Sequence, residues 1–303
     1  MSRRWFANAL LLVTAAVWGL AFVAQRVGMD YVGPFTFNAV RFALGAAVLT
    51  AIIRGRVLRE SGRAGAAKTA ASGFPGGEAA RGGLLLGVVL FVASSFQQMG
   101  MVYTTAGKAG FITGLYVVLV PLAGALLLGE RHGMHIWAGA LLAAAGLYLL
   151  SVTGAWHMEK GDVLVLVSAL FWTAHVILVG RLTAAHDSLT LAARQFAVVA
   201  VLSAAVALVR EPVTVDGLRG ALAAILYGGL ISVGVGYTLQ VIAQQYALPA
   251  HAAIIMSLES VFAMLGGALL LDERVGLRGL VGAGLMLAGM VISQWERGEA
   301  REP

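Results

Sequence analysis

The chain has 303 residues, of which 59% are hydrophobic and 12% are charged, with a mean hydropathy of +0.86 and a net charge of +6. A soluble domain carries about 25% charged residues, so this composition excludes an ordinary soluble enzyme or binding domain and indicates a membrane protein. The absence of cysteine excludes disulfides, a thiolate nucleophile and a cysteine metal site. Because the basic residues gather mainly in one loop and at the termini, the positive charge predicts membrane topology and no nucleic-acid partner.

Apolar stretches of membrane-spanning length follow one another along the chain. A hydrocarbon core about 30 Å thick is crossed by roughly 20 helical residues. Every backbone polar group must be bonded internally in lipid, and no two-residue alternation indicates a barrel, so we expect helices only. The ten predicted spans are 5–27, 35–53, 82–102, 108–128, 133–152, 161–180, 188–209, 219–240, 251–271 and 275–294. The predicted fold class is therefore an all-α, polytopic membrane protein with ten transmembrane helices.

One connection, residues 54–81, is long, basic and rich in Gly, Ala and Ser. We expect it to be a flexible cytoplasmic loop, either binding anionic membrane lipids or only setting the topology. With that loop inside, ten spans place both termini, including the tail 295–303, in the cytoplasm. The predicted location is the inner or plasma membrane of the cell.

A repeated block shows how the spans are organised. GALLLGER at 124–131 returns as GALLLDER at 267–274, and 13 of 28 positions agree between 124–151 and 267–294. The halves 1–152 and 155–294 then hold five predicted spans each. Because five is odd, the second half enters the membrane from the opposite side. Such inverted repeats are common in secondary transporters.

Glu259 is the first candidate for chemistry, because it lies about nine residues into its span and so about 13 Å deep. An acid there costs on the order of 3 kcal/mol and usually faces a cavity, and burial favours its neutral form. The repeat alignment pairs Glu259 with Tyr116. A proton-coupling or solute-binding role and a purely structural hydrogen-bonding role both remain open.

Aromatic and polar side chains at matching depths complete the predicted solute site. Trp18 and Trp172 can form an apolar box for a planar or cationic solute, or can simply pack. His175, one turn from Trp172, is either proton-linked or a satisfied hydrogen-bonding group. Arg41 and Arg194 either snorkel to the membrane boundaries or, more sharply, bind a solute carboxylate. The remaining candidates for the cavity wall and its polar vestibules are Tyr237, Met256, Gln97 and Gln240.

Four residues interrupt the predicted spans four and eight and are candidate hinges for alternating access, with tight packing as the alternative. They are Gly114, Pro121, Gly234 and Gly236.

Several segments together resemble the drug/metabolite transporter superfamily, and in particular the EamA-type exporters, over about residues 5–294. The residues that carry the resemblance are Ala16-Val17-Trp18-Gly19, Gly33-Pro34-Phe35 with Arg41-Phe42, Thr113-Gly114-Leu115-Tyr116 with Pro121, Ser257-Leu258-Glu259-Ser260-Val261-Phe262, and the two GALLL blocks. The resemblance implies ten helices in two inverted repeats, a central cavity, and outward movement of amino acids, metabolites or drugs. Where the family usually has L-E-P-V-F, this chain has Ser260 in place of the proline, so a kink in that span is not expected.

These observations predict a secondary transporter that exports a small metabolite, amino acid or amphipathic drug by alternating access, with Glu259 available for proton coupling. No ATP-binding, cofactor or metal motif is visible, so no cofactor is expected. Two alternatives remain open: an intramembrane enzyme using Ser257, Glu259 and His251 on a lipid-linked substrate, and a non-transporting scaffold or receptor. Small residues on spans five and ten also make a homodimer a candidate assembly.

Overall fold

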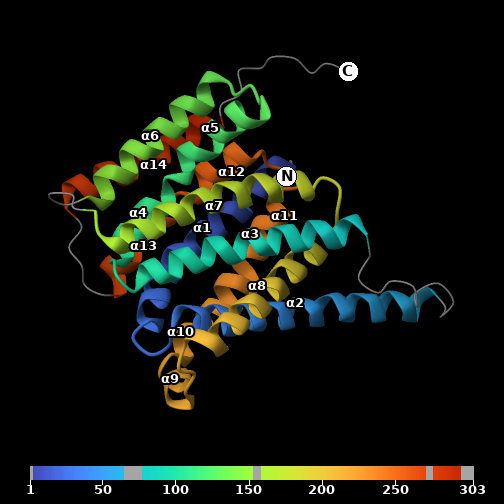
Figure 1. Ribbon diagram of the computed structural model, residues 1–303. Coiled ribbons are helices and arrows are strands. Elements are labelled where there is room, and N and C mark those ends of the chain that lie inside the picture. Colours follow the sequence, from blue (N-terminus) through green and yellow to red (C-terminus); the bar gives the residue numbers. More distant parts are fainter. Residues whose placement is uncertain (1–2, 65–76, 153–157, 271–275, 295–303) are drawn as a thin grey trace.

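The computed structural model describes residues 3–64, 77–152, 158–270 and 276–294, and within these ranges every regular element is a helix. The predicted all-α class is confirmed (Figure 1). In chain order the helices are α1 (Arg3–Gly28), α2 (Pro34–Ala64), α3 (Glu78–Met101), α4 (Ala106–Gly114), α5 (Tyr116–Leu128), α6 (Met134–Ser151), α7 (Lys160–Leu182), α8 (Ser188–Arg210), α9 (Val215–Gly220), α10 (Leu222–Leu226), the π-helix η1 (Tyr227–Tyr237), α11 (Thr238–Ala243), α12 (Pro249–Met256), α13 (Glu259–Leu270) and α14 (Leu277–Ser293).

Helical segments occupy all the stretches that hydropathy predicts to cross the membrane. In the described part of the chain, seven of them are long and apolar enough to span it. Three shorter apolar segments, Met134–Leu150, Pro249–Leu265 and Leu277–Ser293, stand where spans five, nine and ten are predicted. The protein is a multi-pass membrane protein.

The predicted loop 54–81 needs correction at both ends. Helix α2 continues to Ala64 and α3 begins at Glu78, while residues 65–76 lie outside the described residues. Arginine, leucine and glutamate favour helix, and a helix that leaves lipid keeps its backbone bonds, so hydropathy marks the membrane boundary but not the helix end. Figure 1 shows the end of α2 projecting beyond the other helices. The predicted tail 295–303 also lies outside the described residues.

The eighth span is another departure from a simple α-helix. It consists of α10, η1 and α11, and η1 is a π-helix of 11 residues. A π-helix, which forms i→i+5 hydrogen bonds, is rare and is frequently found at functional sites. Hydropathy predicts the span but contains no signal for this geometry.

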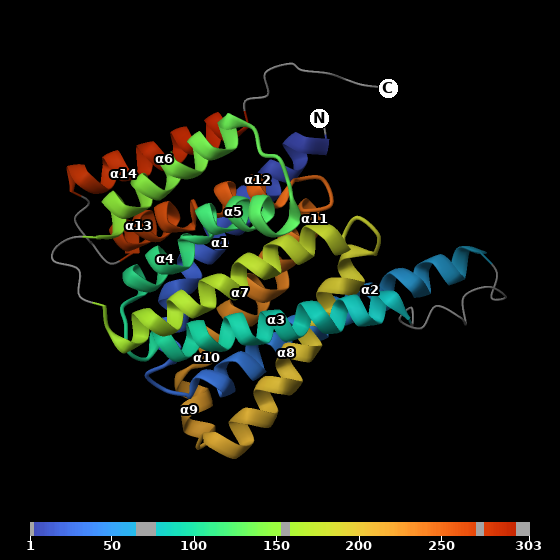
Figure 2. The ribbon, with the colours of Figure 1, turned by 45° about the horizontal axis from the view of Figure 1, so that its top comes forward.

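Helices from the two halves of the sequence are mixed in space. α6 packs along α14, α2 along α8, and α3 along both α7 and α8. Figure 2 shows the α6–α14 pair on one side of the bundle and α2, α3 and α8 on the other. Helix α1 lies between these groups, where it contacts α13, η1, α11 and α12.

A glycine seam joins α6 to α14. A Cβ on Gly139 would meet the carbonyl oxygen of Gly289, and one on Gly289 would meet the carbonyl oxygen of Gly139. Gly146 and Gly282 face each other in the same reciprocal way. Because the repeat alignment pairs Gly139 with Gly282 and Gly146 with Gly289, the Gly139–Gly289 contact and the Gly282–Gly146 contact are equivalent to each other, as contacts across a two-fold axis are. The small-residue seam behind the homodimer prediction is thus occupied within one chain, so a homodimer would need another surface.

The second half also caps a helix of the first half. Glu211, at the end of α8, accepts hydrogen bonds from the backbone nitrogens of Phe35 (2.8 Å) and Thr36 (2.7 Å), and from the Thr36 hydroxyl (2.7 Å). A carboxylate suits this position, since the first backbone N–H groups of a helix have no partner within the helix. A Cβ on Gly33 would meet this carboxyl group, so a larger residue there would displace Glu211 from the cap.

The two ends of the described chain lie on one side of the bundle. Near the start of α1, Arg4 Nη2 donates to the Gln294 carbonyl oxygen at 2.8 Å, and Asn8 Nδ2 donates to Gln294 Oε1 at 3.1 Å. An even number of spans brings both ends of a chain to the same membrane face.

Candidate functional site

A cavity lies at the centre of the bundle. Side chains from both halves of the sequence line it: Trp18, Phe22, Gln25, Arg41, Gln97, Thr113, Tyr116, Trp172, Val176, Ser232, Tyr237, Gln240, Met256 and Glu259. Eight of the nine predicted solute or coupling residues are among them. The ninth, His175, lies directly behind the wall.

Two of the spans that line the cavity are interrupted as α-helices. Span four is divided into α4, which ends at Gly114, and α5, which begins at Tyr116. Span nine is divided at the aligned position into α12, which ends at Met256, and α13, which begins at Glu259. The expectation that span nine has no kink stays a prediction, because this interruption lies within the apolar helical segment Pro249–Leu265. The chain breaks without proline, and the Ser257 hydroxyl donates to the carbonyl oxygen of Ile254 at 2.8 Å.

Glu259 and its alignment partner Tyr116 meet across the cavity wall. The Glu259 side chain is buried, with 2% of the residue exposed, and its Oε1 lies 3.5 Å from the Tyr116 hydroxyl. That distance is at the long limit for a hydrogen bond between oxygens, so the carboxyl group is only weakly engaged. On the other side, a Cβ on Gly19 would meet the carbonyl oxygen of Glu259, so glycine in α1 allows α13 to pack closely.

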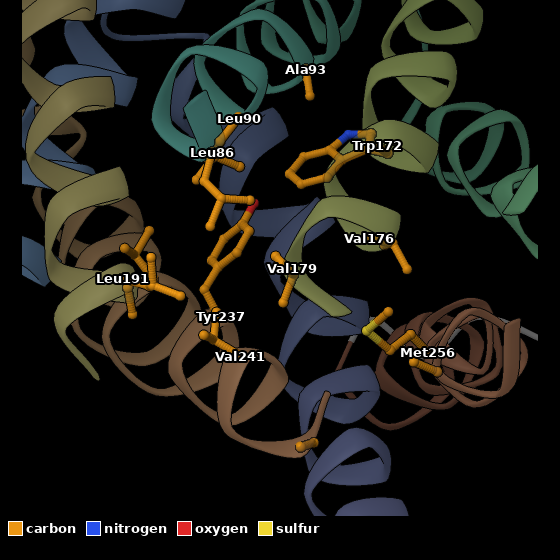
Figure 3. Close-up of a cluster of buried hydrophobic side chains, with 14 of the residues drawn as sticks. Leu86, Leu90, Ala93, Trp172, Val176, Val179, Leu191, Tyr237, Val241 and Met256 are labelled. Atoms are coloured by element: carbon orange, nitrogen blue, oxygen red, sulfur yellow. The ribbon is translucent and has the colours of Figure 1, made fainter. Parts of the chain in front are cut away.

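Three aromatic rings form one wall of the cavity. The Tyr237 ring centroid lies 4.6 Å from that of Trp18 and 5.9 Å from that of Trp172, with the Tyr237 and Trp172 planes at 26°. Figure 3 shows Trp172 and Tyr237 within one cluster of buried side chains that also contains Val176 and Met256. Aromatic pairs at such separations favour fixed relative orientations. The predicted box of Trp18 and Trp172 thus has Tyr237 as its third member.

Arg41 is also in the cavity wall, which the snorkelling expectation did not foresee. Only 1% of the residue is exposed. Its Nε donates to Asn38 Oδ1 at 3.0 Å, and its guanidinium carbon lies 5.4 Å from the Phe37 ring centroid and 4.9 Å from that of Phe42. Snorkelling is wrong for Arg41, because the side chain is held inward by aromatic faces and an amide instead of reaching a boundary.

The polar residues that were predicted to line the site form hydrogen bonds with other side chains of the bundle. Gln97 Nε2 donates to Thr113 Oγ1 at 3.0 Å, and Gln240 Nε2 donates to Gln244 Oε1 at 3.0 Å. His175 Nε2 lies 2.8 Å from Gln195 Oε1, and its ring meets the Trp172 ring edge-on at 5.8 Å. His175 therefore supports the wall from behind, as a hydrogen-bonded group would.

The four candidate hinges lie at helix irregularities of different kinds. Gly114 is the last residue of α4, next to the break, whereas Pro121 lies inside the continuous helix α5. Gly234 and Gly236 belong to η1. A Cβ on Gly236 would meet the indole nitrogen of Trp18, so close packing already accounts for this glycine. A hinge role stays a prediction for all four.

The residues invoked for an intramembrane enzyme do not form a nucleophile–base pair in this structure. The Ser257 hydroxyl is bonded to the carbonyl oxygen of Ile254, and the Glu259 carboxyl group faces Tyr116. The His251 ring lies 6.2 Å from that of His135. No contact among these described residues favours catalysis over solute binding.

Comparison with known proteins decides the family. The model of a family described as "EamA-like transporter family" matches residues 5–152 and 159–294. The chain belongs to the EamA-like transporter family. This EamA-like protein is a membrane transporter by family, in agreement with its apolar helices and central cavity.

Similar proteins support the same assignment. An uncharacterized transporter of Archaeoglobus fulgidus is 29% identical over 290 residues, which cover 96% of this chain and 86% of that protein. A second uncharacterized transporter of this organism is 25% identical over 294 residues, covering 96% and 98% of the two chains. A solved structure, titled only as the crystal structure of a protein, has a TM-score of 0.76 at 20% identity and covers 96% of this chain and 97% of that one. At this identity it shows the fold alone.

Sequence reasoning left several wall residues out of the site. Phe22, Gln25, Thr113, Val176 and Ser232 line the cavity but were not predicted to do so. Arg41 also lines the cavity, and for this residue the sequence leaves snorkelling and binding of a solute carboxylate as alternatives. Helical periodicity shows which residues share a face, but not the rotation of each helix about its axis. The signal that could have found Arg41 is its position between Phe37 and Phe42.

Proposed function

We propose that this protein is a secondary transporter that exports a small metabolite, amino acid or amphipathic solute through the central cavity by alternating access. The observation that carries the proposal is the position of Glu259. This buried acid lines the cavity at the point where span nine breaks, and among the described residues its side chain is hydrogen-bonded to Tyr116 alone, at 3.5 Å. Ionisable groups inside a membrane usually mark a solute or ion pathway.

In this proposal Glu259 takes up a proton or contacts a cationic part of the solute. A carboxyl group with one long hydrogen bond can change partner at low cost, whereas a fully bonded structural carboxyl could not. The aromatic wall of Trp18, Trp172 and Tyr237 would receive an apolar or planar part of the solute. The energy would come from an ion or solute gradient.

The proposed architecture is two inverted repeats, 1–152 and 155–294. The proposed location is the inner or plasma membrane of the cell, with both termini in the cytoplasm. Its support is the reciprocal contact of aligned glycines between α6 and α14, together with the shared location of Arg4, Asn8 and Gln294. A pair of equivalent contacts, in which a residue of one repeat meets a non-aligned residue of the other and their aligned counterparts meet in the same way, is what a two-fold axis in the membrane plane produces.

The test begins with the solute. Extracellular metabolites are compared between cells that overexpress the full chain and cells that lack it, and an unchanged profile would contradict export. The solute found in this way is then used for flux measurements in proteoliposomes at several pH values. We expect wild-type flux to vary with pH.

Glu259→Gln should lower the flux about tenfold or more and remove its pH dependence, because a charge-assisted contact contributes about 1.5–3 kcal/mol. Glu130→Gln is the matched control, since Glu130 is partly exposed and does not line the cavity. Full, normally pH-dependent flux in Glu259→Gln would show that Glu259 has no coupling role.

A further inference from the structure

The guanidinium group of Arg41 is a buried cation without a counter-ion. Among the described residues, Arg41 forms no ion pair, and its Nη2 has no hydrogen-bond partner. Placing a charge away from water is costly unless it is paired and hydrogen-bonded. Arg41 is 1% exposed, its Nη2 is buried, and the residue lines the cavity.

The surroundings fix the guanidinium group in position. One edge is held by Asn38, whose Nδ2 in turn donates to the carbonyl oxygen of Ser94 at 3.2 Å. The Phe37 and Phe42 rings lie within cation–π distance. Arg41 packs beside Gly228 of η1, where a Cβ would lie 3.4 Å from Arg41 Cδ. A guanidinium held in this way is preorganised to offer its remaining N–H groups to a planar anion.

Further free polar atoms in the same cavity wall separate into donors and acceptors. Trp172 Nε1 is a second buried donor without a partner, and Gln25 Oε1 and Gln240 Oε1 are buried acceptors without one. Buried polar groups are normally bonded, so orphaned atoms in a cavity wall need an explanation. A solute that accepts hydrogen bonds at one end and donates them elsewhere would satisfy these atoms.

Arg41 and Glu259 approach the cavity from separate helices. α2 packs on α8 and η1, whereas α13 packs on α1, α4 and α6. Tyr237 lines the same cavity as both groups, and its ring lies beside those of Trp18 and Trp172.

We propose that Arg41 is the anion-binding residue of the cavity and that the transported solute carries a carboxylate joined to an apolar or aromatic part. This proposal rests on the proposed transport function, because it assigns a substrate class to the same cavity. The carboxylate would accept hydrogen bonds from the free guanidinium N–H, and its apolar part would lie on Trp18, Trp172 and Tyr237.

The test measures binding without transport. The full-length protein in detergent is titrated with three carboxylates of increasing apolar size, namely acetate, 4-methylpentanoate and 3-phenylpropionate, and with the three corresponding amides. Binding is followed by the shift in melting temperature. Each amide keeps the shape of its acid but lacks the charge. We expect 3-phenylpropionate to bind on the order of tenfold more tightly than 3-phenylpropanamide, because hydrogen bonds to a charged group are the stronger ones.

The preference for the carboxylate should disappear in Arg41→Gln and should persist in part in Arg41→Lys, which keeps the charge but loses the planar fork. Arg194→Gln is the matched control, because Arg194 lies in the spanning helix α8 but does not line the cavity. It should keep the full preference. A wild-type protein that binds none of the carboxylates more tightly than its amide overturns the proposal, even if Arg41→Gln does not fold. An unchanged preference in folded Arg41→Gln overturns it as well.

Failure of this proposal and failure of the proposed transport are distinguishable. If the protein prefers carboxylates in detergent but carries no flux in proteoliposomes, the proposed anion site is supported and the proposed transport function is contradicted. If the protein carries flux but shows no preference for carboxylates, only the proposed anion site is contradicted.

Discussion

The segments 5–152 and 159–294 both match the same family model, yet they place different chemistry at equivalent positions. Aligned aromatic residues meet in pairs at the centre: the ring centroids of Trp18 and Trp172 are 6.3 Å apart, and those of Phe42 and Phe196 are 6.0 Å apart. The charged residues have no charged counterpart. Glu259 aligns with Tyr116. Near the starts of the two halves, the segment from Thr36 to Phe42 matches that from Thr190 to Phe196, which pairs Arg41 with Gln195.

The local environments explain why this asymmetry is tolerated. Gln195 is bonded to His175 at 2.8 Å. In the first segment, the residue aligned with His175 is Ala21, which offers Arg41 no such partner. The comparison teaches that the shared scaffold supplies the packing surfaces, while the differences between the segments supply the ionisable groups of the cavity.

The largest expected effect comes from breaking the shared scaffold at the glycine seam. Gly282→Ala places a Cβ against the backbone of Gly146 and Leu150, which cannot move aside. We expect a loss of about 1–3 kcal/mol or more from overpacking, measured as a lower melting temperature and a smaller monodisperse peak in gel filtration. Gly284→Ala in the same helix is the control, because its Cβ would meet nothing within 4 Å. Equal melting temperatures for the two variants would contradict the seam.

The next effect concerns the contact that ties α4 to α7. Asp162, whose side chain is fully buried, accepts a hydrogen bond from the Thr104 hydroxyl at 2.6 Å and lies 3.4 Å from Lys108 Nζ. Asp162→Asn should lower the free energy of unfolding by about 1–3 kcal/mol, because charge-assisted bonds to a buried carboxylate are lost. Thermal unfolding in detergent measures this, and an unchanged melting temperature would show that the contact adds nothing.

A smaller effect tests the asymmetry between Tyr116 and Glu259. Tyr116→Phe removes one hydrogen bond of 3.5 Å and leaves the ring in place. We expect flux to fall by roughly two- to fivefold, since a weak neutral hydrogen bond contributes about 1 kcal/mol or less. Proteoliposome flux beside Glu259→Gln is the measurement. If Tyr116→Phe lowered the flux as much as Glu259→Gln, the two residues would act as one unit, and the idea that Glu259 alone has the ionisable role would be contradicted.

The smallest effect is expected at the opposite end of α7. Arg181 Nη2 lies 3.9 Å from Glu130 Oε1, and the two side chains are 54% and 35% exposed. Arg181→Gln should change the free energy of unfolding by less than about 1 kcal/mol, as is usual for exposed ion pairs. A melting-temperature loss as large as that of Asp162→Asn would show that both ends of α7 are fastened equally.

The sequence is sufficient to predict the helices and most of the cavity wall, and the physical reason differs between the two. Hydropathy alone locates the spans, because lipid imposes length and composition on each helix. Depth and the repeat alignment lead to Glu259, Tyr116 and the tryptophans, which do lie around one cavity. The break before Glu259 and the π-helix η1 could not be predicted, because they depend on tertiary packing. The sequence could not decide between an inward position of Arg41 and snorkelling, because both explain an arginine at that depth.

The packing of α6 on α14, and of α2 and α3 on α7 and α8, bears on which bodies can move. Each of these contacts joins the first half of the sequence to the second. The covalent halves are therefore not the mechanical halves: a rocking motion that kept these interfaces intact would carry α2, α3, α7 and α8 as one arm and α6 with α14 as another. The broken spans four and nine, each drawn from a different half, would then be the joints between the arms.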